Sequence, residues 1–369
     1  MRWSTRNITA LLLYGAIVTG IAFMSYQKPS YNWDTLAYMA IILNYEEQDV
    51  NKVFKTTLTE ARATMPARSY HLLTDTAHAL RKELMADVNT FFQYTSFFRV
   101  KPLYNLSSYL AYRAGFPLAK APVIPSIVSY LAIAFLSLFW LRSFFPLWLA
   151  AVLSLSIMIA PPMLEAARLA TPDALSTVIV LGSIFMIRKQ VAWHWIVLML
   201  TVAILVRVDN VMFAAIVLVG LIKIPSSSVR PAPKLPQTAV AIVCWALLTG
   251  WIMYNASYQN GFENFYGGLS NKTEFVSIIK NAFTGLYTLQ TSHLSNILAI
   301  CAVLLFYRTN WRAGLNVSQY LFLVLMFYAA VRFIMFPDLT TRFFLVIYVM
   351  CVWLSLERIA EWQKGLQRE

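Results

Sequence analysis

Hydrophobic residues occur along this chain in long runs, all but one of them uncharged, and most of the polar segments between them are short. The first run covers residues 8–26, and later runs cover residues 123–141, 144–160, 174–187, 191–206, 211–221, 238–254, 291–307, 319–336 and 343–356. A helix needs roughly 17–25 mostly apolar residues to cross the hydrocarbon core of a bilayer. The pattern therefore predicts an all-α polytopic membrane protein with about ten transmembrane helices, in one integral membrane domain over residues 1–369.

The polar segment 27–121, between the first two runs, is too long to be a simple turn and forms the predicted first outer loop. Within it, apolar residues recur at helical spacing in two stretches, which predicts two amphipathic helices. Their apolar faces consist of Val50, Val53, Phe54, Leu58 and Ala61, and of Leu73, Ala77, Leu80, Leu84, Val88 and Phe91. The sequence leaves two arrangements open: helices lying along the membrane surface, or a small cap packed on itself.

Composition supports a membrane location. Hydrophobic residues make up 59% of the chain and charged residues only 13%, whereas soluble domains contain about 25% charged residues. The net charge of +13 is explained by basic cytoplasmic loops and by contact with anionic lipids, so membrane lipids are expected partners and nucleic acid is not. Cys244, Cys301 and Cys351 lie inside apolar runs and are interpreted as buried packing residues.

The distribution of basic residues predicts which loops face the cytoplasm. Arg2 and Arg6 precede the first run, which we interpret as a retained signal anchor. Basic residues also occupy the alternate short loops, at Arg142, Arg188, Lys189, Arg230, Lys234, Arg308 and Arg312. The distribution thus predicts that the chain crosses the cell inner (cytoplasmic) membrane several times and has both termini in the cytoplasm. The linker 225–236 is then cytoplasmic, and residues 255–290 form a second outer loop.

With this topology, charged residues near the span ends converge on the outer face. The acids are Asp34, Glu165, Asp173, Asp209 and Asp338, and the cations are Lys101, Arg168, Arg207 and Arg342. Charges next to or within spans usually mark function. Two interpretations are open: structural ion pairs that close the helix ends, or a cavity for an anionic, membrane-resident substrate.

Asp34 has a local interpretation as well. Asp is a favoured helix N-cap, so Asp34 would cap a helix that begins at Thr35. Trp33 and Tyr38 on either side of it are residue types suited to the headgroup region of a membrane.

Four stretches together carry a resemblance to a known family. They are Asp34 after the first run, Arg99-Val100-Lys101-Pro102-Leu103-Tyr104, the segment from Glu165 to Leu175, and Thr341-Arg342-Phe343-Phe344-Leu345. They resemble the GT-C glycosyltransferases, in the branch of protein O-mannosyltransferases and lipid A aminoarabinose transferase. Arg168 and Asp173 stand where that branch has its Arg-x-x-x-x-Asp-Ala-Leu segment. One proline of the family's Lys/Arg-Pro-Pro-Leu-Tyr stretch is missing here, and the Tyr and Pro of its Arg-Tyr-x-Leu-Pro stretch are replaced.

The resemblance implies an inverting transfer of a hexose or pentose from a polyprenyl-phosphate carrier to a hydroxyl acceptor, with a periplasmic active site. Asp34 would be the general base. Lys101, Arg168 and Arg342 would bind the carrier phosphate, Asp173 would orient Arg168 or the sugar, and Tyr104 would contact the substrate. Arg207, Asp209 and Glu165 would support these residues. Both a metal-free reaction and one with Mg²⁺ or Mn²⁺ held by Asp34 and Asp173 stay open. The acceptor could be a glycan, a lipid or a protein.

Two other functions compete with this hypothesis. The first is a transporter or flippase for a lipid-linked anionic molecule. Transporters tend to place charges at mid-membrane in interrupted helices and to carry internal repeats, whereas these charges gather at one face next to a long outer loop. The second is a non-catalytic scaffold for cell-envelope assembly, which only an activity measurement separates from an enzyme.

Overall fold

The computed structural model describes residues 5–77, 79–223, 233–256, 293–307, 316–335 and 341–366. Within these residues the chain is helical, and extended backbone pairs only at an isolated bridge between Ser30 and Leu169. The all-α fold class is therefore confirmed. Asp338 and most of the segments 225–236 and 255–290 lie outside the described residues. The end of the first segment, from Leu235, already belongs to helix α14.

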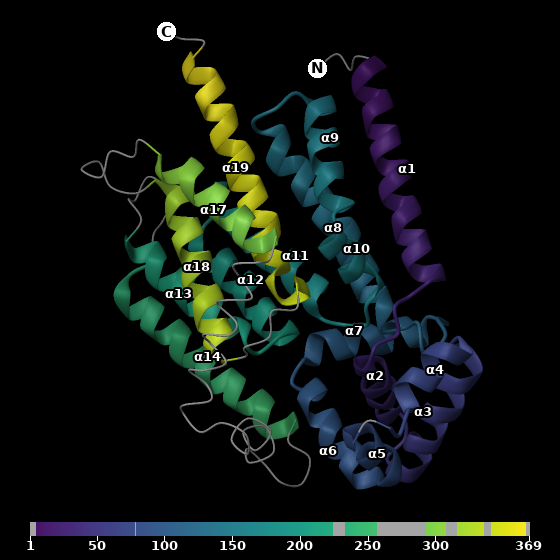
Figure 1. Cartoon of the computed structure of the whole chain (residues 1–369). Coiled ribbons are helices and arrows are strands. Elements are labelled where there is room, and N and C mark those ends of the chain that lie inside the picture. The colour runs from purple at the N-terminus through teal and green to yellow at the C-terminus, as the bar shows by residue number, and fades with distance from the viewer. Residues whose placement is uncertain are drawn as a thin grey trace.

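The described helices form two groups, a bundle and a cap (Figure 1). The bundle contains α1 (Thr5–Gln27), α8 (Val123–Arg142), α9 (Leu147–Met158), α10 (Pro161–Arg168), α11 (Asp173–Arg188), α12 (Trp193–Val206), α13 (Asn210–Lys223), α14 (Leu235–Ala256), α17 (His293–Phe306), α18 (Val317–Met335), the short 3₁₀ helix η2 (Thr341–Phe344) and α19 (Leu345–Leu366). The cap contains α2 (Trp33–Asn44), α3 (Val50–Thr64), α4 (Ala67–Thr74), α5 (Ala79–Ala86), α6 (Val88–Arg99) and α7 (Pro102–Arg113).

Aromatic and hydroxyl side chains hold the bundle together. Trp140 of α8 stacks on Trp353 of α19 with ring centroids 4.8 Å apart, and the indole N–H of Trp353 donates to Ser137 Oγ at 3.2 Å. The hydroxyl of Tyr14 on α1 donates to the carbonyl of Ala134 at 2.7 Å. A polar group buried among apolar helices is costly unless it is hydrogen-bonded, so these bonds fix how the helices are rotated against one another.

The cap has a hydrophobic core of its own, to which Val53, Ala61, Leu73, Leu84 and Phe91 contribute. The two predicted apolar faces therefore point into one shared core, which is the second of the two arrangements left open by the sequence. The prediction of one continuous second amphipathic helix was wrong, because its stretch is divided among α4, α5 and α6. Asp87 ends one helix and begins the next, because its carboxylate accepts the backbone N–H groups of Asn89 and Thr90.

Fewer spans are found among the described residues than the ten that the hydrophobic runs predict. Among the described residues, four helices are long and apolar enough to cross a membrane, and a fifth candidate is the α9–α10 pair, which bends by 67°. The four are Thr5–Gln27, Val123–Arg142, Leu235–Ala256 and Arg342–Lys364. The helices at most of the other predicted positions are shorter, and 14 residues extend only about 21 Å at 1.5 Å per residue, less than a hydrocarbon core of about 30 Å.

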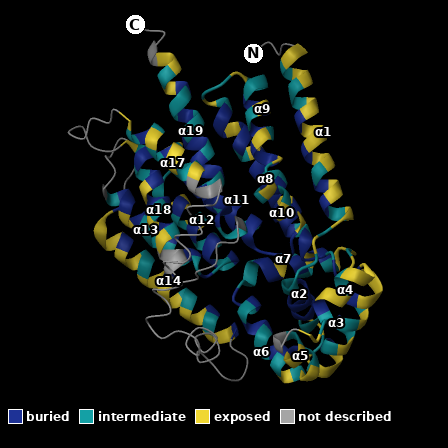
Figure 2. Cartoon of the chain, viewed as in Figure 1, coloured by how far each residue is buried: buried dark blue, intermediate teal, exposed yellow. Residues whose placement is uncertain are grey.

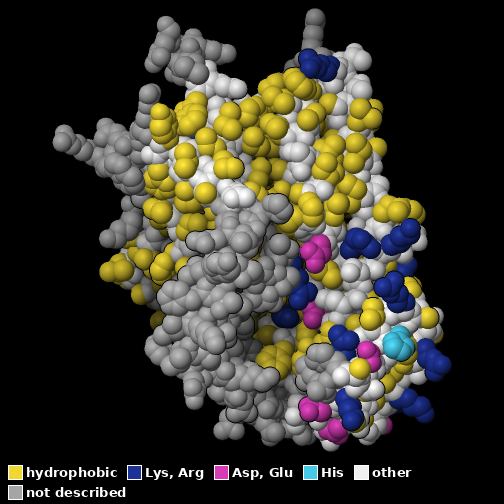
Figure 3. Space-filling model, viewed as in Figure 1, with side chains coloured by type: hydrophobic (Ala, Val, Ile, Leu, Met, Phe, Trp, Pro, Cys, Tyr) yellow, Lys and Arg dark blue, Asp and Glu magenta, His cyan; other side chains and the backbone are white. Residues whose placement is uncertain are grey.

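The surface agrees with a membrane protein. In the face seen in Figure 3, hydrophobic side chains cover the half of the molecule nearer the termini, and charged side chains gather on the cap. Figure 2 shows many exposed positions along α1 and α14, and on α14 they include Val243 and Leu247. Cys301 and Cys351 are buried as predicted, whereas Cys244 on α14 is exposed, so that prediction was wrong for one of the three cysteines.

Candidate functional site

The candidate site is assembled at the end of the bundle next to the cap, where two connecting segments run side by side. Ser30, in the link between α1 and α2, donates its backbone N–H to the carbonyl of Arg168 at 2.9 Å. Arg168 in return donates from Nε to the carbonyl of Lys28 at 2.9 Å. The second segment is anchored to α8, because Ser126 Oγ donates to the carbonyls of Leu169 and Thr171. These bonds place the start of α2 beside the start of α11.

The start of α2 sets the position of Asp34. Asn32 is the N-cap: its backbone N–H donates to Thr35 Oγ1 at 3.3 Å, and the Thr35 hydroxyl donates to Asn32 Oδ1 at 3.1 Å. The prediction that Asp34 caps this helix was therefore wrong, since the helix begins one residue before it. Asp34 instead lies in the first turn, where the helix dipole favours a carboxylate, and its Oδ2 accepts the Asn32 amide at 3.1 Å.

Arg342, at the start of the last helix, bridges the carboxylates of α2 and α11. Its Nη1 donates to Asp34 Oδ2 at 3.2 Å, and its Nε lies 3.9 Å from Asp173 Oδ2. Only 19% of the Arg342 and Asp34 side chains is exposed, and 3% of Asp173. Residues from the first, middle and last parts of the chain thus meet at one guanidinium group.

Arg207 extends this arrangement to the turn between α12 and α13. Its Nη1 forms an ion pair with Asp173, and its Nε and Nη2 bind Asp209 in bidentate fashion at 3.0 and 2.9 Å. Asn210 fixes the turn, because its amide donates to Ser176 Oγ and to the carbonyl of Ala203, each at 2.8 Å. We call Asp34, Asp173, Arg207, Asp209 and Arg342 the ion-pair cluster.

Lys101, at the turn between α6 and α7, lies beside the cluster but has a different kind of partner. Its Nζ donates to the Tyr38 hydroxyl at 3.0 Å and lies 4.7 Å from the centre of the Phe98 ring. No carboxylate of the described residues lies within 4.0 Å of Nζ. Burial lowers the pKa of Lys101 to about 8; the negative charge of Asp34 acts in the opposite direction, and the positive charge of Arg207 adds to the lowering. An anion bound here would offset the loss of water around the ammonium group.

Three of the predicted site residues lie outside this arrangement. Tyr104 is fully buried; its hydroxyl donates to the carbonyl of Pro122 at 2.6 Å, and its ring packs on Tyr38. It therefore supports Tyr38, and its substrate contact stays a prediction. Arg168 is exposed and holds the α1–α2 link, which is a positioning contact, and its contact with the phosphate stays a prediction. Glu165 is exposed on α10 and does not belong to the ion-pair cluster.

Sequence reasoning missed the hydroxyl that binds Lys101. Tyr38 was expected at the membrane headgroups, but it is buried because Phe98 and Tyr104 pack on its ring edge-to-face. Tyr38 lies one helical turn after Asp34, so the i, i+4 spacing could have placed both on one face. No such signal was present for Asn32, whose role depends on where the helix starts.

The two carboxylates considered for a metal ion both face the same arginine. A divalent cation between Asp34 and Asp173 would have to displace the Arg342 guanidinium, which already supplies positive charge there. Within the described residues, no group of three or more His, Cys, Asp or Glu side chains is arranged to hold a metal ion. The described site contains two partly exposed carboxylates, Asp34 and Asp209, a network of paired charges, and an ammonium group with no described carboxylate within 4.0 Å.

Comparisons of the chain with protein-family models, with curated proteins and with solved structures gave no match.

Proposed function

We propose that the chain is an inverting glycosyltransferase that moves a sugar from a polyprenyl-phosphate carrier to a hydroxyl acceptor at the outer face of the cytoplasmic membrane. The observation that carries the proposal is the contact between Asp34 and Arg342 beside Lys101. It joins a candidate base and two candidate phosphate ligands from distant parts of the sequence. The proposal also includes the shorter apolar helices as part of the membrane domain.

Asp34 has an oxygen available for the proton. Both of its side-chain hydrogen bonds from described residues end on Oδ2, which leaves Oδ1 open in a side chain that is 19% exposed. The acceptor oxygen would attack C1 of the sugar while its proton moves to Oδ1. The bond between C1 and the phosphate oxygen would break with its electron pair going to the phosphate, so the anomeric configuration inverts. A positioned base of this kind contributes typically ~10²–10⁴-fold.

Lys101 is the best supported phosphate ligand. Arg207 is already bound to two carboxylates, and Arg342 to Asp34 and Asp173. A phosphate beside Lys101 would meet an ammonium group whose only hydrogen bond in the described residues goes to a neutral hydroxyl. Preorganised positive charge at the leaving oxygen stabilises the charge that develops there during transfer.

The test is transfer by the purified full-length protein in liposomes. The donor is a radiolabelled sugar on a polyprenyl phosphate, and the acceptors are lipid, glycan and protein fractions of the source membrane. The expected result is radiolabel on one of these fractions, together with release of polyprenyl phosphate that no longer carries a sugar. Both signals should be lost in Asp34→Asn. Both should be kept in the matched variant Glu165→Gln. Movement of an intact donor across the bilayer would instead identify a flippase. If neither transfer nor movement of the donor is detected, the non-catalytic scaffold is the hypothesis that remains.

A further inference from the structure

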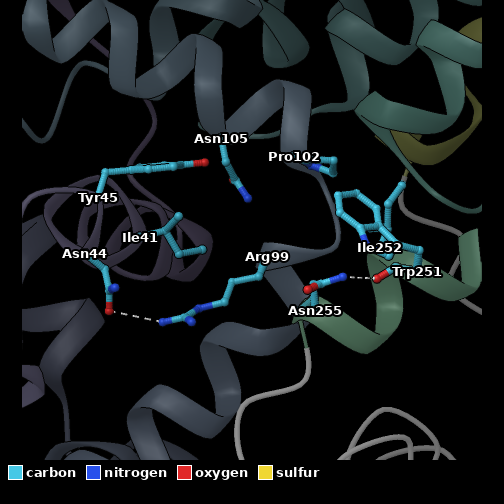
Figure 4. Close-up of a pocket in the computed structure, with 10 residues that line it drawn as sticks. Ile41, Asn44, Tyr45, Arg99, Pro102, Asn105, Trp251, Ile252 and Asn255 are labelled. Carbon is cyan, nitrogen blue, oxygen red and sulfur yellow. Dashed lines mark hydrogen bonds between the residues drawn. The ribbon is translucent and has the colours of Figure 1, made fainter. Parts of the chain in front are cut away.

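A pocket of about 240 Å³ lies beside the turn between α6 and α7, where Arg99, Pro102 and Asn105 line it (Figure 4). Its polar lining consists of the amides of Asn44, Asn105 and Asn255 and the guanidinium of Arg99, and Tyr45 and Trp251 supply aromatic rings. None of the described residues that line it is a carboxylate. The volume lies below the ~300–1,000 Å³ of sites for drug-sized ligands, which suits one small polar group.

One residue that lines the pocket, Asn105, carries a buried oxygen with no hydrogen-bond partner among the described residues. Asn105 is 3% exposed, and its amide nitrogen donates to the carbonyl of Phe98 at 3.0 Å. Its Oδ1 has no hydrogen-bond partner among the described residues. An unmet buried acceptor destabilises the fold, so a ligand that donates a hydrogen bond would relieve this cost. Sugar hydroxyl groups are donors of that kind.

The aromatic rings are placed at the entrance. Trp251 is 63% exposed and Tyr45 is 47% exposed, and Figure 4 shows them on opposite sides of the pocket, on α14 and at the end of α2. Amides together with exposed aromatic faces suit a ring that has hydroxyl groups at its edge and C–H groups on its faces.

The pocket is fixed relative to the proposed base through α2. Asp34, Tyr38, Ile41 and Tyr45 follow one another at intervals of three and four residues, so they lie on one face of the chain's second helix and its end. Ile41, which lines the pocket, comes about two turns after Asp34, or about 10 Å along the axis. On the other wall, Ile252 packs with Val100 and Val208, the neighbours of Lys101 and Arg207.

We propose that this pocket binds a sugar ring of the acceptor, and that the acceptor is therefore a glycan with at least two sugar units. This inference rests on the proposed transferase function. A reacting hydroxyl must come within about 2.6–3.2 Å of its base, and the pocket is too far from Asp34 for that. The ring in the pocket is therefore a neighbour of the ring that reacts.

The first experiment measures binding without turnover. Free disaccharides are added to the purified full-length protein in nanodiscs, and saturation-transfer NMR detects which bind. Trp251→Ala is expected to weaken binding about tenfold, because an aromatic contact is lost, whereas Trp251→Phe keeps most of it. Tyr254→Ala is the matched control, since Tyr254 is an exposed aromatic residue on α14 outside the pocket. Equal binding by wild type and Trp251→Ala, or no binding by wild type, overturns the proposal.

The second experiment separates the pocket from the transferase function. In the transfer assay, Trp251→Ala should raise the acceptor KM about tenfold and leave the donor KM unchanged. A change confined to the donor KM would overturn the proposal, because the pocket would then serve the donor. Disaccharide binding that depends on Trp251 in a protein without transfer would reject the transferase function alone. Transfer that is unaffected by Trp251→Ala would reject the pocket alone.

Discussion

Helix α11 forms an ion pair at each of its ends, one with Arg342 of η2 and one with Glu357 in the middle of α19. The two ends differ in kind. At the cap end, Asp173 and Arg342 belong to the ion-pair cluster. At the other end, the last residue of α11, Arg188, pairs with Glu357 of α19, and the Ser318 hydroxyl donates to the same carboxylate oxygen at 2.8 Å. The two ends of α11 thus provide a comparison between a candidate site and a structural ion pair.

The two ends differ in which group is incompletely paired among the described residues. At the Glu357 end it is an acceptor, Oε2, in a side chain that is only 1% exposed. At the cap end it is a cation, because Lys101 binds a neutral hydroxyl and no carboxylate of the described residues lies within 4.0 Å. A buried acceptor cannot receive an anionic substrate, whereas an ammonium group beside a partly exposed carboxylate can. Ion pairing alone therefore does not mark the functional end.

The largest expected difference comes from replacing the arginine of the ion pair by glutamine, first at the cap end of α11 and then at its other end. Arg342→Gln should lower transfer by about 10²–10³-fold, the typical cost of removing a preorganised donor that stabilises developing charge. Arg188→Gln should leave kcat and both KM values close to wild type. Initial rates per folded molecule in liposomes give the comparison. Equal losses in both variants would mean that the pairs at both ends act only through structure.

The next effect concerns stability and should reverse the order of the two ends. Arg188→Gln leaves the buried Glu357 carboxylate unpaired. Breaking a fully buried pair costs about 3–5 kcal/mol; since 29% of the Arg188 side chain is exposed, we expect about 2 kcal/mol. The double variant Arg188→Gln/Glu357→Gln should recover part of this loss, because it removes both charges. Thermal unfolding in detergent measures all three variants. A double variant less stable than Arg188→Gln would contradict an unpaired charge as the cause.

The comparison also separates what the sequence could and could not predict. Hydrophobic runs are local, so the positions of α8, α14 and α19 followed from the sequence, and counting charges placed Asp34 and Arg342 at one end. Their contact could not be predicted, because it depends on how distant helices pack. The break between α4 and α5 was missed because the apolar spacing continues through it. The buried position of Tyr38 was missed because its residue type alone suggested the membrane surface, and that of Tyr104 because the family resemblance suggested a substrate contact.

A smaller effect should appear as a pH dependence of donor binding. Burial lowers the pKa of Lys101 to about 8 from its ordinary value near 10.5, so the ammonium form is present below this pH and is lost as the pH rises through it. The donor KM should therefore rise above pH 8, by about tenfold per unit once Lys101 is mostly neutral. Lys101→Arg should abolish this rise, because a guanidinium stays protonated. A rise that persists in Lys101→Arg would assign the titration to another group.

The smallest effect compares two helix caps of similar strength, only one of which touches the cluster. Asn32 caps α2 and donates to Asp34, whereas Asp49 caps α3 by accepting the backbone N–H groups of Asn51 and Lys52. Asn32→Ala and Asp49→Ala should each cost about 1 kcal/mol of stability. Only Asn32→Ala should also slow transfer, by roughly fivefold, because Asp34 then loses one of the two donors that orient its carboxylate. Unfolding midpoints and initial rates for both variants are the measurements. A similar slowing by Asp49→Ala would show that the stability of the whole cap, helices α2 to α7, sets the rate, and not the orientation of Asp34.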